Sequence, residues 1–301
     1  MKKITQTISH SLIGIIGAGA VLLLARGASA QNVFVSDFRT GSVYEYTSGG
    51  VQSIYATGFD NLAGVAFDSF GNLYVADYSL DTVTKITPGG VRSTVATGLD
   101  NPAGVAVNTA GDVFIANYGA NNIIEVTPLG VQSTFANVDS PSGLILNTAG
   151  DLFATSQGDG TINEMTPQGA VSQFASGLAN PWGLAFNTAG DLFVGNLNGY
   201  GNGAGSVTEI TPKGAESTLI TGLTIPDQMA FNNAGDLLIA EGRSNDLLEY
   251  SSTGSLLQTI TISGAQDLNG LALQPVPEPS TLAVLALGGV GFLLRRYRMK
   301  A

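Results

Sequence analysis

One phrase recurs along the chain at a nearly constant interval. It joins a small apolar run, a turn such as Asn-Thr-Ala-Gly-Asp and a second apolar run, as in residues 102–117. A period near 40 residues with short apolar runs between turn residues is typical of the blades of a β-propeller. The glycines of the recurring turn, spaced by 40, 39, 40 and 45 residues, are Gly71, Gly111, Gly150, Gly190 and Gly235.

Each period is predicted to form four strands, because apolar and polar residues alternate between turn residues. In one such period the strands are expected at 103–107, 113–117, 122–127 and 131–135. Six innermost strands are expected, at 64–67, 104–107, 143–146, 183–186, 228–231 and 270–273. Six second strands are expected, at 33–37, 73–77, 113–117, 152–156, 192–196 and 237–241.

The two ends of the repeat region are predicted to share one blade. The region opens on a second strand at 33–37 and closes on an innermost strand at 270–273. Pairing these strands closes the ring and covers the edges that both would otherwise expose. We therefore expect an all-β, six-bladed β-propeller of four-stranded blades over residues 31–275, with helix only in the terminal segments. A solenoid of the same period is the alternative, although it would not need this offset between the ends.

The N-terminal segment has the order of a secretory signal peptide. Residues 1–30 begin with two lysines, continue with an apolar run at 12–24 and end in small residues. Ala28 and Ala30 occupy the A-x-A positions at which signal peptidase cleaves. An uncleaved anchor helix is the alternative, but the apolar run is shorter than the roughly 20 residues that span a bilayer.

The C-terminal segment, residues 276–301, is predicted to be a sorting tail. Pro277, Glu278 and Pro279 precede an apolar run at 282–294 and a final arginine cluster. The prolines separate this run from the preceding strand, and the basic flank should stay on the cytoplasmic side of the membrane. These features resemble the PEP-CTERM signal of Gram-negative bacteria, which implies recognition and removal by an exosortase in species that make extracellular polysaccharide. An ordinary membrane anchor would give the same topology, but the tail would persist.

The charge of the repeat region limits its partners. Residues 31–275 contain five basic and 22 acidic residues, so their net charge is near −17. Such a surface repels nucleic acid and anionic membranes. We expect no nucleic-acid partner, membrane contact only through the tail, and a location in the cell envelope, at the outer surface or outside the cell.

One face of the ring is the expected binding face. The loops that leave the second strands and enter the innermost strands emerge there, and they vary among blades, whereas the turns on the opposite face are nearly uniform. The second strands all end in polar residues, which either cap the following loops or form a ring around the channel mouth. These residues are Asp37, Asp77, Asn117, Ser156, Asn196 and Glu241.

Two blades depart from the small residues that usually begin the innermost strand. Trp182, the one tryptophan, replaces alanine, and Asp227 with Gln228 replaces Ala-Gly. Asn269 belongs to the same rim. Trp182 either packs or contacts ligand, and an aromatic ring beside polar groups suits sugar or peptide binding. The binding-face candidates are Trp182, Asp227, Gln228, Asn269, Asn196, Asp37, Asp77 and Asn117.

The repeat resembles the NHL-repeat and regucalcin/gluconolactonase-like propellers. It shares their Pro-x-Gly-Leu-Ala-Phe and Gly-Asp-Leu-Phe-Val phrases over essentially all of residues 31–275. Gluconolactonase-like enzymes hold a divalent metal with Glu, Asn and Asp, so the resemblance implies Glu241, Asp227 and Asn269 as ligands of calcium or another hard divalent cation. The glutamate and the Pro-x-Trp that begin that family's domain are missing here.

Missing residue types restrict the catalytic chemistry. The only histidine is His10, in the signal peptide, and the chain has no cysteine. The repeat region therefore lacks a Ser-His-Asp triad, a histidine base and most zinc sites, which also argues against a virginiamycin-lyase type of propeller. We predict a non-catalytic envelope or matrix module that binds exopolysaccharide or envelope proteins, with metal-dependent lactone hydrolysis as the alternative and no residue assigned a catalytic role.

Overall fold

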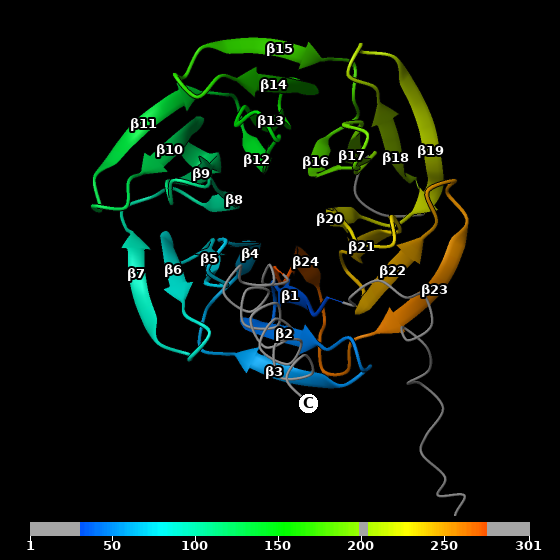
Figure 1. The fold of residues 1–301 in the computed structure, drawn as a ribbon, viewed down its shortest axis with the longest axis horizontal. Coiled ribbons are helices and arrows are strands. Elements are labelled where there is room, and N and C mark those ends of the chain that lie inside the picture. The colour runs from blue at the N-terminus through cyan, green and yellow to red at the C-terminus, as the bar shows by residue number, and fades with distance from the viewer. Residues whose placement is uncertain (1–30, 199–203, 276–301) are drawn as a thin grey trace, which may run out of the picture.

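A computed structural model describes residues 31–198 and 204–275 of the chain. They form a ring of six four-stranded antiparallel sheets, and the chain passes from blade to blade around it (Figure 1). The predicted six-bladed propeller is confirmed. Within the described ranges no helix is long and apolar enough to cross a membrane. The predicted signal peptide with Ala28 and Ala30, and the tail with Pro277, Glu278 and Pro279, lie outside the described residues.

We number the blades I to VI along the chain and name the strands of each blade from the innermost outward. Blade I contains β24 (Leu268–Leu273), β1 (Val33–Asp37), β2 (Ser42–Tyr46) and β3 (Gln52–Ala56). Blade II contains β4 (Leu62–Phe67), β5 (Leu73–Asp77), β6 (Thr82–Ile86) and β7 (Arg92–Ala96). Blade III contains β8 (Pro102–Val107), β9 (Val113–Asn117), β10 (Asn122–Val126) and β11 (Gln132–Asn137), with a 3-10 turn, η1 (Tyr118–Ala120), after β9. Blade IV contains β12 (Pro141–Leu146), β13 (Leu152–Ser156), β14 (Thr161–Met165) and β15 (Val171–Ala175). Blade V contains β16 (Pro181–Phe186), β17 (Leu192–Asn196), β18 (Gly205–Ile210) and β19 (Glu216–Leu223), and blade VI contains β20 (Pro226–Phe231), β21 (Leu237–Glu241), β22 (Asp246–Tyr250) and β23 (Leu256–Thr261).

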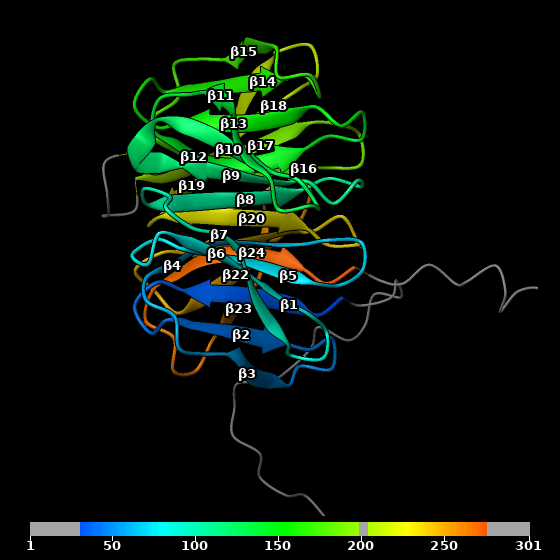
Figure 2. The ribbon, with the colours of Figure 1, turned by 90° about the vertical axis from the view of Figure 1, so that its left-hand side faces the viewer.

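The ring closes in blade I, where the two ends of the repeat region meet. Strand β1 pairs antiparallel with β24, with Val33 opposite Leu273 and Val35 opposite Leu271. Figure 2 shows this blue and orange pair side by side within the ring. The shared blade is confirmed, and the solenoid alternative is excluded.

Apolar side chains fill the space between each pair of adjacent blades. The six clusters of buried residues each draw on two neighbouring blades. The cluster between blades VI and I contains Val35 from β1, Leu247 from β22 and Leu268 and Leu271 from β24. Burial between blades is thus continuous around the ring, and β24 contributes to it directly.

The innermost strands begin two residues earlier than expected, because each starts at a β-bulge. Leu62 pairs with Asp77, but the next pair joins Val65 to Val75, so two residues of β4 face one residue of β5. The same shift occurs between Pro102 and Val105 in blade III. A bulge breaks the strict alternation from which strand ends are predicted.

Close contact between neighbouring innermost strands explains their small residues. A Cβ atom at Gly64 would lie 2.6 Å from the Ala103 carbonyl oxygen, and one at Gly270 would lie 2.5 Å from that of Ala63. The equivalent atoms at Gly104, Gly143 and Gly183 would also meet backbone of the next blade. In these five blades only a residue without a Cβ permits this approach. Blade VI is the exception, because it has Gln228 at the equivalent position.

Side-chain caps explain why the turns of the opposite face are uniform. Asn147 Oδ1 accepts the backbone N–H groups of Ala149 and Asp151, and its Nδ2 donates to Asp151 Oδ2. The recurring Thr-Pro-x-Gly turns work similarly, since Thr87 Oγ1 accepts the Val91 N–H at 3.1 Å. The repeated residues of this face hold its turns, as expected for a structural face.

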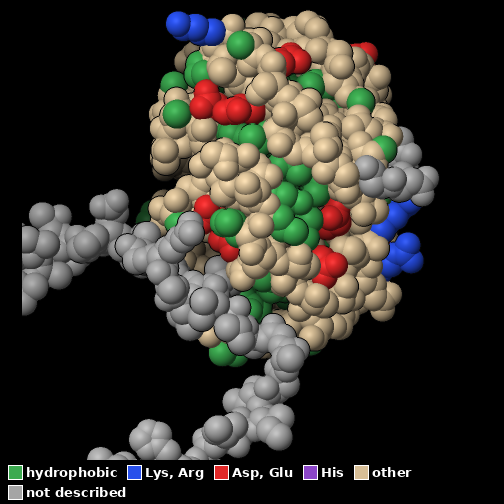
Figure 3. Space-filling model, turned by 90° about the vertical axis from the view of Figure 1, so that its right-hand side faces the viewer, with side chains coloured by type: hydrophobic (Ala, Val, Ile, Leu, Met, Phe, Trp, Pro, Cys, Tyr) green, Lys and Arg blue, Asp and Glu red, His purple; other side chains and the backbone are tan. Residues whose placement is uncertain are grey.

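Acidic side chains outnumber basic ones in residues 31–275, and some stand close to one another. Figure 3 shows acidic groups scattered over one side of the ring. Partial burial is the larger cause that raises the pKa of Glu125, and the negative charge of Asp112 is the smaller one. In the same way, partial burial is the larger cause that raises the pKa of Glu164, and the negative charge of Asp151 is the smaller one.

These two glutamates should make the fold less stable as the pH rises. Each binds its proton more tightly when folded than when unfolded, so its stabilising effect is present below its ordinary pKa of 4.5 and is lost as the pH rises through the raised value. At pH 7 we expect the double variant Glu125→Gln/Glu164→Gln to melt about 2 °C higher than the native protein, which corresponds to a gain of roughly 0.5 kcal/mol per site. At pH 4 we expect the variant and the native protein to melt at the same temperature. A lower melting temperature at pH 7 in differential scanning calorimetry would contradict this.

Candidate functional site

The polar residues that end the second strands lie on the expected binding face, where most of them bond to backbone of nearby loops. Asp77 Oδ2 accepts the N–H of Asp60 at 2.9 Å, and Asn117 Oδ1 accepts that of Asp100 at 2.6 Å. Ser156 Oγ donates to the Asp139 carbonyl at 2.6 Å. In each case the partner belongs to the loop that enters the innermost strand of the same blade. These bonds support the capping interpretation.

Asp37 and Glu241 make the same kind of contact in blades I and VI. Asp37 Oδ2 accepts the N–H groups of Gln266 and Asp267, and Glu241 Oε1 accepts those of Thr224 and Ile225.

Asn196 of blade V differs from its counterparts in the other blades. Its Nδ2 donates to Thr208 Oγ1 at 3.0 Å, while its buried Oδ1 has no hydrogen-bond partner among the residues described. A ligand-binding role for Asp37, Asp77, Asn117 and Asn196 stays a prediction.

A cavity of about 250 Å³ opens on this face, where loops from five of the six blades meet. Four of its residues directly follow a second strand or begin an innermost one, and carry aromatic rings: Phe38, Tyr78, Tyr118 and Trp182. The remaining lining residues are Ala63, Leu197, Ile225, Asp227, Arg243, Asp267 and Asn269. We call this space the mouth cavity.

The four aromatic side chains form a continuous row, which we call the aromatic arc. Ring centroids are separated by 5.9 Å from Phe38 to Tyr78, by 6.5 Å from Tyr78 to Tyr118 and by 6.2 Å from Tyr118 to Trp182. All four side chains are half-exposed. The Tyr118 hydroxyl donates to Gln157 Oε1 at 2.7 Å, which fixes its ring. The arc therefore offers a preformed aromatic surface.

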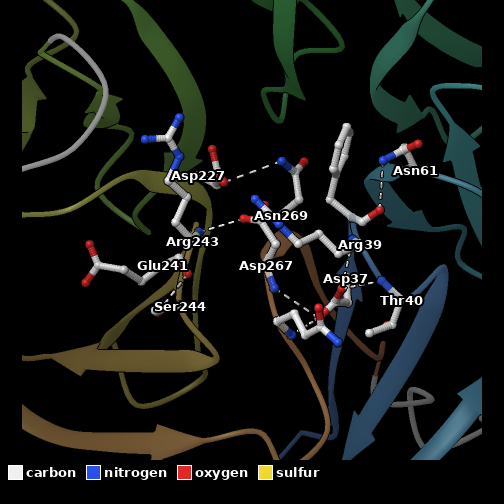
Figure 4. Close-up of polar contacts among 12 residues, drawn as sticks. Asp37, Arg39, Thr40, Asn61, Asp227, Glu241, Arg243, Ser244, Asp267 and Asn269 are labelled. Carbon is white, nitrogen blue, oxygen red and sulfur yellow. Dashed lines mark hydrogen bonds and ion pairs between the residues drawn. The ribbon is translucent and has the colours of Figure 1, made fainter.

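Polar groups from blades VI and I line the same cavity. Asn269 Nδ2 donates to Asp227 Oδ2 at 3.4 Å (Figure 4). Asp267 accepts the backbone N–H of Arg243 at 2.6 Å and pairs with the Arg39 side chain at 3.1 Å. Of the five basic residues of the repeat region, Arg243 lines the mouth cavity, and Arg39 pairs with the lining residue Asp267.

Among the acids of the site, Asp227 has the pKa that is shifted furthest from its ordinary value. It is 4% exposed, and burial raises its pKa well above the ordinary value of 3.8. The charges of Asp267 and Glu241 raise this pKa further, while Arg243 lowers it. A buried carboxyl with such a pKa at a cavity is a common mark of a functional site.

The residues nominated as metal ligands do not converge. Asp227 and Asn269 are in contact, but Figure 4 shows the Glu241 side chain pointing away from both. Its Oε1 is bonded to two backbone N–H groups of the loop before β20. Within the described part of the chain, no three His, Cys, Asp or Glu side chains are grouped so that they could hold a metal ion. The set fits a divalent cation poorly.

Three of the nominated residues line one cavity, and several lining residues were not predicted. Trp182, Asp227 and Asn269 come together, whereas Gln228 lies in β20 outside the lining. The missed residues include Phe38, Tyr78 and Tyr118. Each directly follows one of the predicted binding-face residues Asp37, Asp77 and Asn117. The aromatic residue at that next position is the feature of the sequence that could have predicted them.

The tail matches a known sorting motif. Residues 275–298 match the PEP-CTERM protein-sorting motif, which marks exported proteins that are anchored or processed at the membrane by an exosortase-type enzyme. This motif covers a small part of the chain and indicates an exported surface protein. No curated protein sequence matches the chain.

Solved structures share the propeller fold at low sequence identity. A chain of the nidogen/laminin complex has a TM-score of 0.72 and 17% identity, covering 82% of this chain and 99% of its own. XC5397, a gluconolactonase from Xanthomonas campestris, has a TM-score of 0.63 and 15% identity, covering 83% and 94%. The calcium-binding protein regucalcin from Agrobacterium tumefaciens has a TM-score of 0.60 and 15% identity, covering 72% and 78%. At these identities the likeness concerns the fold alone.

Proposed function

We propose that the protein is an exported, non-catalytic surface module that binds extracellular polysaccharide at its mouth cavity. The observation that carries this proposal is the aromatic arc, which lines the same cavity of about 250 Å³ as Asp227 and Asn269. An apolar surface with a few fixed polar groups is the usual composition of a small-ligand site. The C–H faces of a sugar ring pack on aromatic rings, and its hydroxyls bond to carboxyl and amide groups.

Export supports an extracellular ligand. The sorting motif marks exported proteins, and signal peptidase and an exosortase-type enzyme would process the two ends of the chain. The resemblance of the tail to signals from species that make extracellular polysaccharide favours a polysaccharide ligand over an envelope protein. Its final location, in the envelope or secreted, follows from whether the tail is removed.

Retention on the exopolysaccharide of the producing species tests the proposal. We expect Trp182→Ala to weaken retention about tenfold, which corresponds to the roughly 1.4 kcal/mol of one lost aromatic contact. The fold should survive, because Ala63 and Ala103 occupy the equivalent position in blades II and III. Phe70→Ala is the matched control, since Phe70 is 81% exposed on the opposite face. Equal retention of native and Trp182→Ala proteins, or retention only on envelope protein, would overturn the proposal.

Metal-dependent lactone hydrolysis is the competing function. It predicts turnover of a lactone in the presence of calcium, zinc or manganese, and loss of that turnover in Glu241→Gln. The hydrogen bonds of Glu241 to backbone weigh against it, because a carboxylate oxygen already accepting two N–H groups is a poor ligand. We expect no turnover across a lactone panel with any of these ions, and measurable metal-dependent turnover would replace the proposed function.

A further inference from the structure

We propose that the mouth cavity accepts a sugar residue carrying a free amino group, a deacetylated hexosamine, with its ring on the aromatic arc and its ammonium group toward Asp227. This inference rests on the proposed function and names the class of polysaccharide that the cavity would select.

The position of the Asp227 side chain is the first observation. It is 96% buried yet lines the cavity, and its one hydrogen bond among the described residues is the 3.4 Å contact with Asn269. A carboxylate has about four acceptor sites, so most of this group's capacity is unused. A buried carboxyl with unused capacity, facing a cavity, is suited to accept charged N–H donors.

The distribution of charge is the second observation. Asp267 is already held by the Arg39 side chain and the Arg243 N–H, which leaves Asp227 as the acid without a close ion pair in the cavity. Arg243 lines the cavity as well and opposes a bound cation. Its electrostatic influence on Asp227 is smaller than that of Asp267 or of Glu241, since those two are the stronger causes of the raised pKa. The charges of Asp267 and Glu241 favour a positive ligand group beside Asp227, and such a group would itself lower the raised pKa of Asp227 and hold its carboxyl in the ionised form.

The size of the cavity is the third observation. About 250 Å³ lies below the roughly 300–1,000 Å³ of pockets for drug-sized ligands. It therefore suits one sugar residue rather than a folded segment of a partner. An N-acetyl group would remove the positive charge and add volume, and a plain hydroxyl would leave Asp227 without its counter-charge.

Three tetrasaccharides with the same β-1,4 backbone test the inference on the processed protein: those of glucosamine, N-acetylglucosamine and glucose. Isothermal titration calorimetry at pH 6 should give at least tenfold tighter binding of the glucosamine tetramer than of the other two. Asp227→Asn should lower the affinity for the glucosamine tetramer to that for the glucose tetramer. Glu216→Gln, which removes the same charge from exposed β19, should leave all three affinities unchanged.

A linear polyamine, spermine, controls for attraction of any cation to the acidic body. If spermine binds as tightly as the glucosamine tetramer, charge alone explains the result and the inference is overturned. Equal affinities for all three tetramers would overturn the inference and leave the proposed function intact. If no tetramer binds, the inference is again overturned, and retention on native exopolysaccharide decides separately on the proposed function. The comparison of tetramers on the native protein requires no variant to fold.

Discussion

A chain of residues 31–266 is expected to show no cooperative unfolding transition, whereas a chain of residues 31–275 unfolds cooperatively. The shorter chain lacks β24, which supplies the innermost strand of blade I and its pairing with β1. It also lacks Leu268 and Leu271, both buried between blades VI and I. Each buried leucine contributes about 1.5–3 kcal/mol, and the unpaired strand adds further loss. The total is comparable to the roughly 5–15 kcal/mol that stabilises an average domain.

Thermal unfolding followed by circular dichroism compares the two chains. The longer chain retains every described strand, so it controls for the absence of the terminal segments. A transition of the 31–266 chain at the same temperature and with the same steepness would show that the ring does not depend on its closing strand.

The variant Gly64→Ala is expected to destabilise the ring by about 3 kcal/mol, the upper part of the range for overpacking. The added Cβ would lie 2.6 Å from the Ala103 carbonyl oxygen and 2.9 Å from the Gly104 Cα. Both are backbone atoms of the neighbouring innermost strand and cannot rotate away. Relief of the overlap requires β4 and β8 to move apart, which disturbs the packing between blades II and III.

Gly89→Ala is the matched control for this variant. The nearest atom to a Cβ at Gly89 would be Thr87 Oγ1 at 3.8 Å, and its backbone is not in the left-handed region. We expect urea unfolding to place Gly89→Ala within about 0.5 kcal/mol of the native protein, as for most surface substitutions. A similar midpoint for Gly64→Ala and Gly89→Ala would contradict the close packing of innermost strands.

The second strands could be predicted to the residue, and the innermost strands could not. Second strands such as Leu73–Asp77 follow a glycine turn and end in a polar residue, so both limits are marked in the sequence. Innermost strands begin at a bulge, where one extra residue interrupts the alternation. Pro102 therefore belongs to β8, although the alternating pattern begins only after it.

The candidate site was predicted only where a residue broke the repeat. Trp182 and Asp227 depart from the small residues of other blades, and both line the mouth cavity. Phe38, Tyr78 and Tyr118 occupy equivalent positions of successive blades, so they look like part of the repeat. Their convergence depends on how the backbone turns after each second strand, and the repeat pattern does not reveal that turn.

Hydrogen bonds show which acid of the variable face holds a loop and which lines the cavity, a distinction that the sequence leaves open. Glu241 and Asp227 are both acids of the variable face, and either could face a ligand. Glu241 bonds to the backbone of the loop before β20, while Asp227 lies against the cavity. Such partners lie 16 or more residues away along the chain, so spacing alone does not reveal them.

Trp182 provides the most direct measurement, because it is the only tryptophan of the chain and it lines the mouth cavity. Its fluorescence emission should shift to shorter wavelength and saturate as the exopolysaccharide is titrated into the processed protein, since a sugar ring on the aromatic arc excludes water from the indole. Binding of the polysaccharide with no change in this emission would place the ligand elsewhere on the ring and contradict a site at the mouth cavity.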